Sequence, residues 1–539
     1  MPRVFVSDKL PAAGLDLLRQ AGIDIDDRQK LKGTELQEAL RAADGVIVRS
    51  DTRLTATELE NPGKLRVIVR AGVGVDNIDV AAATRKGIVV MNTPGGNTVS
   101  TAEHTITLLM SLARHTPAAD ASIRQGKWER SKFVGTQLAG RTLGVVGLGR
   151  IGREVARRAA GLDMKILGFD PFLASTGTAH LGIETVSDLD QLLPRVDFLT
   201  VHTPLTDETR DLIDARRLAL MPKGARVINC ARGGIINEEA LAEGLRSGHL
   251  AGAALDVFVQ EPPPADHPLL QLPNLVITPH LGASTVEAQL SVAKEAAQLI
   301  ADYLVRGVIG FAVNMAAVDK AELNELRLYV DLARRLGLLH SQMSQGAIHK
   351  AVLNYRGDVA RRSTKLITAA FAAGLLETHL DQNVNIVNAP LLAAERGIEI
   401  VEQTSSQQGD FSTLLRVDLT TDKNIYTAAG TLFGNQFLRL VQVGPHHLDS
   451  FLDGVMLLFT HRDVPGLIGF IGTIFGKHQV NIAQMTVGRQ QAGGEAIAVL
   501  NLDSLPPEAA LKEVQAHPQI SSLSVVKLPP AGQMPPWFG

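Results

Sequence analysis

Residues 142–168 read TLGVVGLGRIGREVARRAAGLDMKILG, and this stretch decides the fold. A short apolar run leads into Gly147-x-Gly149-x-x-Gly152, a helical pattern follows, and Asp170 comes just after the next apolar run. A strand, a glycine-rich turn, a helix, a second strand and an acidic residue in this order are the signature of a dinucleotide-binding unit. A glycine-rich turn without a ligand is the alternative, and the complete context disfavours it.

Each glycine has a steric reason to be there. Gly147 permits the tight turn, Gly149 lets backbone approach a pyrophosphate, and Gly152 lets the helix lie close to the strand. The helix N-terminus offers free N–H groups and a positive dipole to the phosphates. Asp170 is expected to accept hydrogen bonds from the adenosine ribose and to repel a 2′-phosphate, so NAD is favoured over NADP.

Composition narrows the class of protein further. With 539 residues, 45% of them hydrophobic, the chain can bury several cores. A net charge of -3 gives no basic footprint for nucleic acid. The single cysteine, Cys230, forms no internal disulfide or cysteine-based metal cluster, and no metal site is expected. We expect a cytoplasmic protein without a leader or a membrane-spanning segment.

Strand-like and helix-like segments alternate through the first 315 residues, which is typical of parallel α/β folds. We expect a multidomain α/β protein in which a flavodoxin-like substrate-binding lobe (residues 1–97 and 284–315) carries an inserted Rossmann NAD-binding lobe (98–283), with a cleft between them. An α+β domain (316–452), a βαββαβ domain (453–528) and a loose tail (529–539) are predicted to follow, with Trp537 and Phe538 as residues that could dock.

Hydride transfer from an alcohol needs a base for the hydroxyl proton and a cation to hold the substrate. Arg232, Glu261 and His280 follow three successive predicted strands, and ligands bind at such strand ends in open α/β sheets. We expect His280 to be the acid/base, Glu261 to orient it and favour its charged form, and Arg232 to grip a carboxylate. The alternative for His280 is a hydrogen-bonded structural histidine.

Several motifs together resemble the D-isomer-specific 2-hydroxy acid dehydrogenases. They are the Gly147–Gly152 turn with Asp170, HTPL at 202–205, CARGG at 230–234, ALDVF at 254–258, QEPP at 260–263 and TPHLGAST at 278–285. VRSDT at 48–52, VRAGVGVDNID at 69–79, MNTPGGN at 91–97 and GKWERSKF at 126–133 resemble the members that oxidise 3-phospho-D-glycerate in the first step of serine biosynthesis. The C-terminal part resembles their long form, which adds an intervening domain and an ACT domain.

The resemblance implies roles for further residues. Arg232, Glu261 and His280 take the family's catalytic positions. The cofactor-binding set would be Gly147, Gly149, Arg150, Ile151, Gly152, Asp170, Thr203, Cys230 and Asp256, with Asp256 at the nicotinamide carboxamide. Arg49, Ser50, Arg70, Gly72 and Gly74 would hold the substrate's phosphate or carboxylate, while Gly96 stands where some relatives carry Asn. Arg130 and Lys132 could add charge from a neighbouring subunit.

THRDVPGL at 460–467 resembles the amino-acid-binding turn of ACT domains. His461, Asp463 and Asn481 are therefore expected to bind L-serine between paired subunits of a homodimer or homotetramer, with Asn481 facing the turn. An ACT domain that serves assembly alone is the alternative. In the middle domain Arg361, Arg362, Lys365, Arg439, His446 and His447 could form an anion site or a solvated basic face.

Two other functions remain open from the sequence. The first is a dehydrogenase for another D-2-hydroxy acid, such as D-lactate, glyoxylate or erythronate 4-phosphate. The second is a non-catalytic NAD-sensing protein on the same scaffold. The arginines of VRSDT and VRAG favour a phosphorylated substrate, and the intact Arg232, Glu261 and His280 set favours an enzyme.

Overall fold

The computed structural model describes residues 1–172, 182–315, 320–380, 383–407, 409–434 and 436–535. The first lobe is a parallel sheet in the order β2-β1-β3-β4-β5. Its elements are β1 (Arg3–Val6), α1 (Ala12–Gln20), β2 (Asp24–Asp26), α2 (Gly33–Ala42), β3 (Gly45–Val48), β4 (Val67–Arg70), α3 (Val80–Arg85), β5 (Val89–Asn92) and α10 (Val286–Arg306). This strand order confirms the flavodoxin-like expectation.

The second lobe is a parallel sheet in the order β12-β11-β10-β9-β6-β7-β8. Successive strands are added on one side of β6 up to β8 and on its other side from β9 onward, so the strand order reverses between β6 and β9. Its strands are β6 (Thr142–Val146), β7 (Lys165–Phe169), β8 (Glu184–Val186), β9 (Phe198–Val201), β10 (Arg226–Asn229), β11 (Gly252–Leu255) and β12 (Leu275–Ile277). Its helices are α4 (Thr98–Arg114), α5 (Thr116–Arg124), α6 (Arg150–Ala160), α7 (Leu189–Leu192), α8 (Ala215–Leu220) and α9 (Glu238–Arg246), with short 3-10 turns at Arg130–Phe133, Leu193–Arg195 and Pro268–Gln271. Ligands bind at such a reversal in doubly wound sheets.

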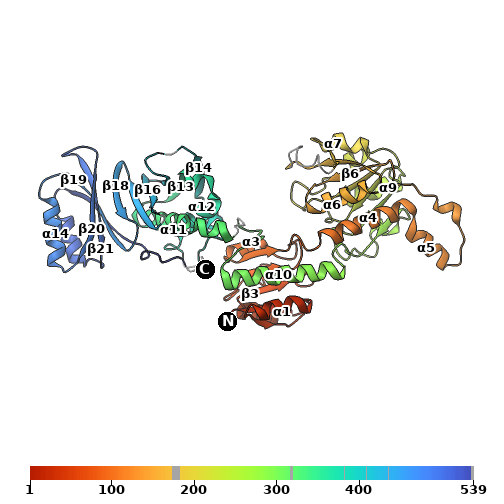
Figure 1. Cartoon of the computed structure of the whole chain (residues 1–539), viewed down its shortest axis with the longest axis horizontal. Coiled ribbons are helices and arrows are strands. Elements are labelled where there is room, and N and C mark those ends of the chain that lie inside the picture. Colours follow the sequence, from red (N-terminus) through yellow and green to blue (C-terminus); the bar gives the residue numbers. More distant parts are fainter. Residues whose placement is uncertain (173–181, 316–319, 381–382, 408, 435, 536–539) are drawn as a thin grey trace.

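Two long helices connect the lobes. The chain leaves the first lobe through α4 and returns through α10, whose alanine-rich face packs on α1 and the first sheet (Figure 1). Gly96 lies against this helix, because a β-carbon there would come within 2.5 Å of Val292 Cγ2. A glycine at that position therefore lets the two connections pass close to each other.

The intervening domain is a six-stranded sheet in the order β14-β13-β15-β16-β17-β18, in which only β13 and β14 run parallel. Its elements are α11 (Lys320–Met343), β13 (Ile348–Gly357), a 3-10 turn (Asp358–Arg361), α12 (Thr364–Leu376), α13 (Ala389–Glu395), β14 (Glu399–Ser405), β15 (Thr413–Thr421), β16 (Ile425–Phe433), β17 (Phe437–Val443) and β18 (His446–Phe451). The sequence predicts a helix over Lys365–Leu380 in this domain, and in the structure α12 ends at Leu376.

The last domain has the expected βαββαβ order, with β19 (Val455–Arg462), α14 (Leu467–Lys477), β20 (Ile482–Arg489), β21 (Glu495–Leu502), α15 (Glu508–Gln515) and β22 (Ile520–Lys527). Its strands lie in the order β20-β21-β19-β22, which is the ferredoxin-like arrangement. Figure 1 shows this half of the chain extending away from the NAD-binding lobe.

The start of the tail is held in place, contrary to the expectation of a loose segment. Arg335 is fully buried, and its guanidinium donates to the carbonyls of Leu452 (3.1 Å), Pro529 (2.6 Å) and Pro530 (3.0 Å). Trp537 and Phe538 lie outside the described residues. Among the helices described, none is both long and apolar enough to cross a membrane.

Candidate active site between the lobes

A cavity of about 740 Å³ lies between the lobes and collects most of the predicted site residues. The first lobe supplies the loops after β3 and β4, and the second supplies the glycine-rich turn and the loops after β9, β10, β11 and β12. All these loops follow the carboxyl ends of parallel strands, which is why residues far apart in sequence meet here. The lining includes Arg49, Ser50, Arg70, Gly72, Gly74, Gly149, Arg150, Ile151, Thr203, Cys230, Arg232, Asp256, Glu261 and His280.

His280 and Glu261 form a hydrogen-bonded pair, with 2.7 Å between Nδ1 and Oε2. Burial alone would raise the pKa of Glu261, but the hydrogen bond and charge of His280, the Phe258 N–H and the charge of Arg232 together lower it. Glu261 is therefore ionised and accepts the Nδ1 proton, which leaves Nε2 of His280 as the atom that can exchange a proton with a substrate.

Arg232 lies close to the same pair and faces the first lobe. Its Nε donates to Asp76 Oδ2 at 2.9 Å, and its Nη1 donates to the carbonyl of Ala231 at 2.6 Å. Asn229 holds the turn that presents it, donating to the Arg232 carbonyl at 2.8 Å. Neither Asp76 nor Asn229 was predicted from the sequence as a site residue. Nothing in the stretch VGVDNID at 73–79 indicates that Asp76 contacts an arginine of the other lobe.

Three guanidinium groups gather at one end of the cleft. Burial first, and then the charges of Arg232 and Arg49, lower the pKa of Arg70 to about 10. Arg70 Nη2 donates to Ser50 Oγ at 3.1 Å, while Arg49 binds the Lys9 carbonyl through Nη1 at 3.2 Å. Because neighbouring cations lower the pKa of Arg70, a bound anion would stabilise this part of the cleft.

The glycine-rich turn has the close approaches expected of it. A β-carbon on Gly147, whose φ is 91°, would lie 2.7 Å from the His202 carbonyl oxygen, and one on Gly152 would lie 2.0 Å from the Gly147 carbonyl oxygen. A β-carbon on Gly149 would instead meet nothing within 4 Å, so it would project into the space at the start of α6. That open space beside free helix N–H groups fits a pyrophosphate.

Asp170 also holds the turn together. Its Oδ2 accepts from Leu148 N at 2.9 Å and its Oδ1 accepts from Phe172 N at 2.9 Å. Contact of Asp170 with a ribose stays a prediction. Thr203 Oγ1 and His202 Nδ1 are buried and have no hydrogen-bond partner among the residues that the structure describes, so a ligand could supply one.

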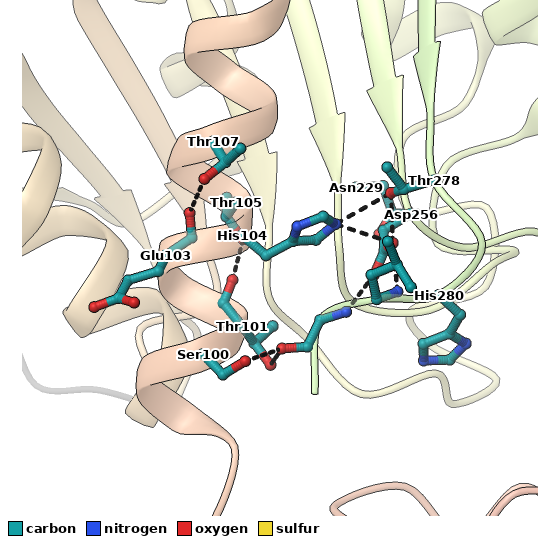
Figure 2. A network of polar contacts seen from close by, with 12 residues as sticks. Ser100, Thr101, Glu103, His104, Thr105, Thr107, Asn229, Asp256, Thr278 and His280 are labelled. Atoms are coloured by element: carbon teal, nitrogen blue, oxygen red, sulfur yellow. Dashed lines mark hydrogen bonds and ion pairs between the residues drawn. The ribbon is translucent and has the colours of Figure 1, made fainter. Parts of the chain in front are cut away.

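Asp256 is 1% exposed, and protein donors contact both of its carboxylate oxygens. Its Oδ1 accepts from Thr278 Oγ1 (2.6 Å), Leu281 N (2.7 Å) and His104 Nε2 (3.1 Å), and its Oδ2 accepts from Gly282 N (2.9 Å) (Figure 2). Its predicted contact with a carboxamide is untested, and His104 is a partner that sequence reasoning missed. Cys230 lies nearby as an uncharged thiol, because burial raises its pKa to about 12.

The predicted regulatory residues do not meet within one chain. Asp463 follows Arg462, which pairs with Glu495 at one end of β21, while Asn481 precedes Ile482, which pairs with Leu502 at the other end. Asn481 therefore does not face the His461–Asp463 turn of its own chain, and its facing the turn of a paired subunit stays a prediction. Asp463 accepts from Arg489 Nη1 at 2.7 Å, Asn481 donates to Asp503 Oδ2 at 2.7 Å, and His461 Nδ1 lies 2.9 Å from the Arg462 carbonyl oxygen.

The basic residues of the middle domain do not form one cluster. Arg361 and Arg362 follow β13, whereas Arg439 lies on β17, two strands further across the sheet than β15. Arg439 stacks on Phe451 at 3.9 Å and bridges to Gln484 of the last domain at 3.3 Å. Within the ranges the structure describes, no group of three or more His, Cys, Asp or Glu side chains could hold a metal ion.

Comparison with known proteins gives three family matches. Residues 106–282 match the D-isomer specific 2-hydroxyacid dehydrogenase NAD binding domain, 325–444 match the D-3-phosphoglycerate dehydrogenase intervening domain, and 455–519 match the ACT domain. D-3-phosphoglycerate dehydrogenases of Methanocaldococcus jannaschii and Bacillus subtilis are each 40% identical over 98% of this chain and 100% of their own length. The Synechocystis relative of the same name is 42% identical over 98% of this chain and 95% of its own.

Solved structures resemble more than half of the chain. An NAD-dependent formate dehydrogenase from Staphylococcus aureus, solved in complex with NAD, has a TM-score of 0.53 and 30% identity over 59% of this chain and 100% of its own. The TT0316 protein from Thermus thermophilus has a TM-score of 0.51 and 38% identity over 56% of this chain and 96% of its own.

Proposed function

Because this chain belongs to the D-3-phosphoglycerate dehydrogenases of the D-isomer-specific 2-hydroxyacid dehydrogenase family, we propose that it oxidises 3-phospho-D-glycerate to 3-phosphohydroxypyruvate with NAD. The observation that carries the proposal is the cleft in which the His280–Glu261 pair lies beside Arg232, Arg70 and Arg49. The open space at Gly149 and the unpartnered Thr203 Oγ1 fit the dinucleotide.

The residues divide the work of the reaction as follows. The glycine-rich turn at Gly147–Gly152 would hold NAD, which would supply the acceptor for the hydride from carbon 2 of the substrate. His280 takes the hydroxyl proton on Nε2, and Glu261 stabilises the resulting imidazolium across the 2.7 Å contact at Nδ1. Arg232 holds the substrate carboxylate, and in the reverse direction the imidazolium returns its proton to the carbonyl oxygen.

The phosphate end explains the choice of substrate. A phosphate near pH 7 carries nearly two negative charges, and Arg49 and Arg70 with Ser50 supply cations and a hydroxyl on the first lobe. A D-2-hydroxy acid without a phosphate would leave the repulsion between these cations offset by Asp76 and Asp8 alone among the charges that act on Arg70 in the described residues. We therefore expect unphosphorylated D-lactate and glycolate to be poor substrates.

The test measures NADH formation with 3-phosphoglycerate against a panel of D-2-hydroxy acids, in the wild type and in His280→Ala. Turnover specific for the phosphorylated acid, lost in His280→Ala while NADH binding persists, supports the proposal. Turnover of another acid alone would assign a different substrate. NAD binding without turnover of any acid would favour an NAD-sensing protein.

We also propose that L-serine binds the ACT domain between two copies of the chain. Asp463 and Asn481 lie at opposite ends of β21, so a single effector can touch both only if each comes from a different subunit. Calorimetry with L-serine on the wild type and on Asn481→Ala tests this. Equal heats in both proteins, or no binding, would contradict it.

A homodimer or homotetramer fits the surface of the NAD-binding lobe. The arm that follows α4 exposes Ile123 (53%), Trp128 (83%) and Val134 (78%), and large apolar side chains so exposed are typical of an interface. We propose that this arm contacts a second copy in the cytoplasm. Sedimentation velocity on the wild type and Trp128→Ser would detect a loss of mass in the variant.

A further inference from the structure

The first two turns of α4 hold the loop that carries His280. Ser100 Oγ donates to the Gly282 carbonyl at 2.7 Å and Thr101 Oγ1 does so at 3.2 Å. One turn further along, His104 Nε2 lies 3.1 Å from both Asp256 Oδ1 and Thr278 Oγ1 (Figure 2). The helix that leaves the first lobe is therefore fastened directly to the catalytic loop.

His280 itself depends on the same contacts. Its φ is 54°, a left-handed conformation that is unfavourable for a non-glycine residue and must be imposed by its surroundings. Its N–H is held by the Asp256 carbonyl at 2.9 Å and the Thr278 carbonyl at 3.1 Å. The next two amides, of Leu281 and Gly282, end on the Asp256 carboxylate at 2.7 and 2.9 Å.

The Asp256 carboxylate thus holds the backbone that follows His280 and stabilises the conformation of His280. Burial would raise its pKa, but the hydrogen bonds from His104, Thr278 and Leu281 outweigh burial and lower it, so it is ionised. An ionised carboxylate only accepts hydrogen bonds, so the Nε2 atom of His104 carries a proton. The His104 side chain is only 16% exposed, and its N–H connects α4 to the Asp256 carboxylate.

We propose that His104 is a positioning residue that keeps His280 in its productive orientation by donating its Nε2 proton to Asp256. The proposal rests on the proposed function, in which His280 is the acid/base. His104 does not reach the reacting atoms itself, because the His280 side chain points away from His104 and Asp256 (Figure 2). Its Nδ1 lies 2.7 Å from Glu261 Oε2 instead. Losing the bond to His104 would let the 278–282 loop relax.

The test compares His104→Leu, which removes the donor, with His104→Gln, whose Nε2 can replace it. The control is His249→Gln, which alters a half-buried histidine bound to the Leu218 carbonyl outside the cleft. We expect His104→Leu to lower kcat about 10- to 100-fold with KM values within about twofold, because misplacement by about 1 Å is costly. His104→Gln should recover most of kcat, and His249→Gln should keep it.

Hydrogen–deuterium exchange of the free protein gives a second readout. Faster exchange at Leu281 and Gly282 in His104→Leu, with wild-type exchange in His249→Gln, is the expected result. Unchanged exchange there, a wild-type kcat in His104→Leu, or failure of His104→Gln to recover kcat in a folded protein would each overturn the proposal. If the wild type itself fails to oxidise 3-phosphoglycerate, the proposed function fails while the exchange result still tests the role of His104.

Discussion

Adding one methyl group at Gly74 would displace Arg232 without disturbing the backbone. A β-carbon on Gly74 would lie 1.8 Å from Arg232 Nη2 and 2.6 Å from Asp76 Oδ2. Gly74 is not among the glycines with positive φ, so alanine is acceptable to the main chain there. The guanidinium is the flexible end of a long side chain, and we expect it to move by more than about 1 Å to regain van der Waals contact distance.

The size of the effect follows from the bonds that Arg232 makes. Hydrogen bonds between charged groups contribute about 1.5–3 kcal/mol each, and about 2.7 kcal/mol corresponds to a hundredfold change. We therefore expect Gly74→Ala to lower kcat/KM for 3-phosphoglycerate by about 100-fold. The thermal midpoint should stay near that of the wild type, because the clash is relieved by a side chain.

The assay is the initial rate of NADH formation at varied 3-phosphoglycerate, with NADH affinity measured by fluorescence. Gly472→Ala in α14 is the matched control, because a β-carbon there meets nothing within 4 Å. A value of kcat/KM in Gly74→Ala within about threefold of wild type would refute the reasoning that Arg232 holds the substrate.

Other predictions follow from the same contacts. Glu261→Gln should lower kcat at least about 100-fold with KM nearly unchanged, since the imidazolium loses its charged partner; steady-state rates between pH 7 and 9 test this, and a wild-type kcat would exclude Glu261 as the partner. Asp170→Ala should lower the affinity for NAD and reduce the preference of the enzyme for NAD over NADP, measured as the ratio of kcat/KM with the two cofactors. An unchanged ratio would contradict the predicted contact of Asp170 with the ribose. Burial lowers the pKa of His340 to about 4. Between about pH 6.5 and 4 the unfolded chain therefore binds a proton that the folded chain does not, and the free energy of unfolding falls by up to about 3 kcal/mol. His340→Leu should flatten the fall of the thermal midpoint over that range, and an equally steep fall would show that other groups cause it.

Much of the fold could be predicted because it depends on local patterns. The sequence predicts helices over Thr98–Arg114 and Leu467–Lys477 from their apolar content, and the structure gives both helices these bounds. Two short edge strands, β2 and β8, were missed, and so were four longer strands of the intervening domain, β13, β14, β16 and β18. Arg335 was missed as well, since its partners at Leu452 and Pro529 are 117 and 194 positions away.

The sequence by itself determined the glycine-rich turn and the placing of Arg232, Glu261 and His280 at strand ends. Parallel strands bring their carboxyl ends to one edge of a sheet. It was therefore enough to know that each of these residues follows a strand to predict that their side chains lie close together. The tertiary structure alone decided which groups hold them. Asp76 is 156 positions from Arg232, and His104 is 152 positions from Asp256. It also placed Asp463 and Asn481 at opposite ends of β21. Strand register and lobe packing set such contacts, and neither is encoded in local periodicity.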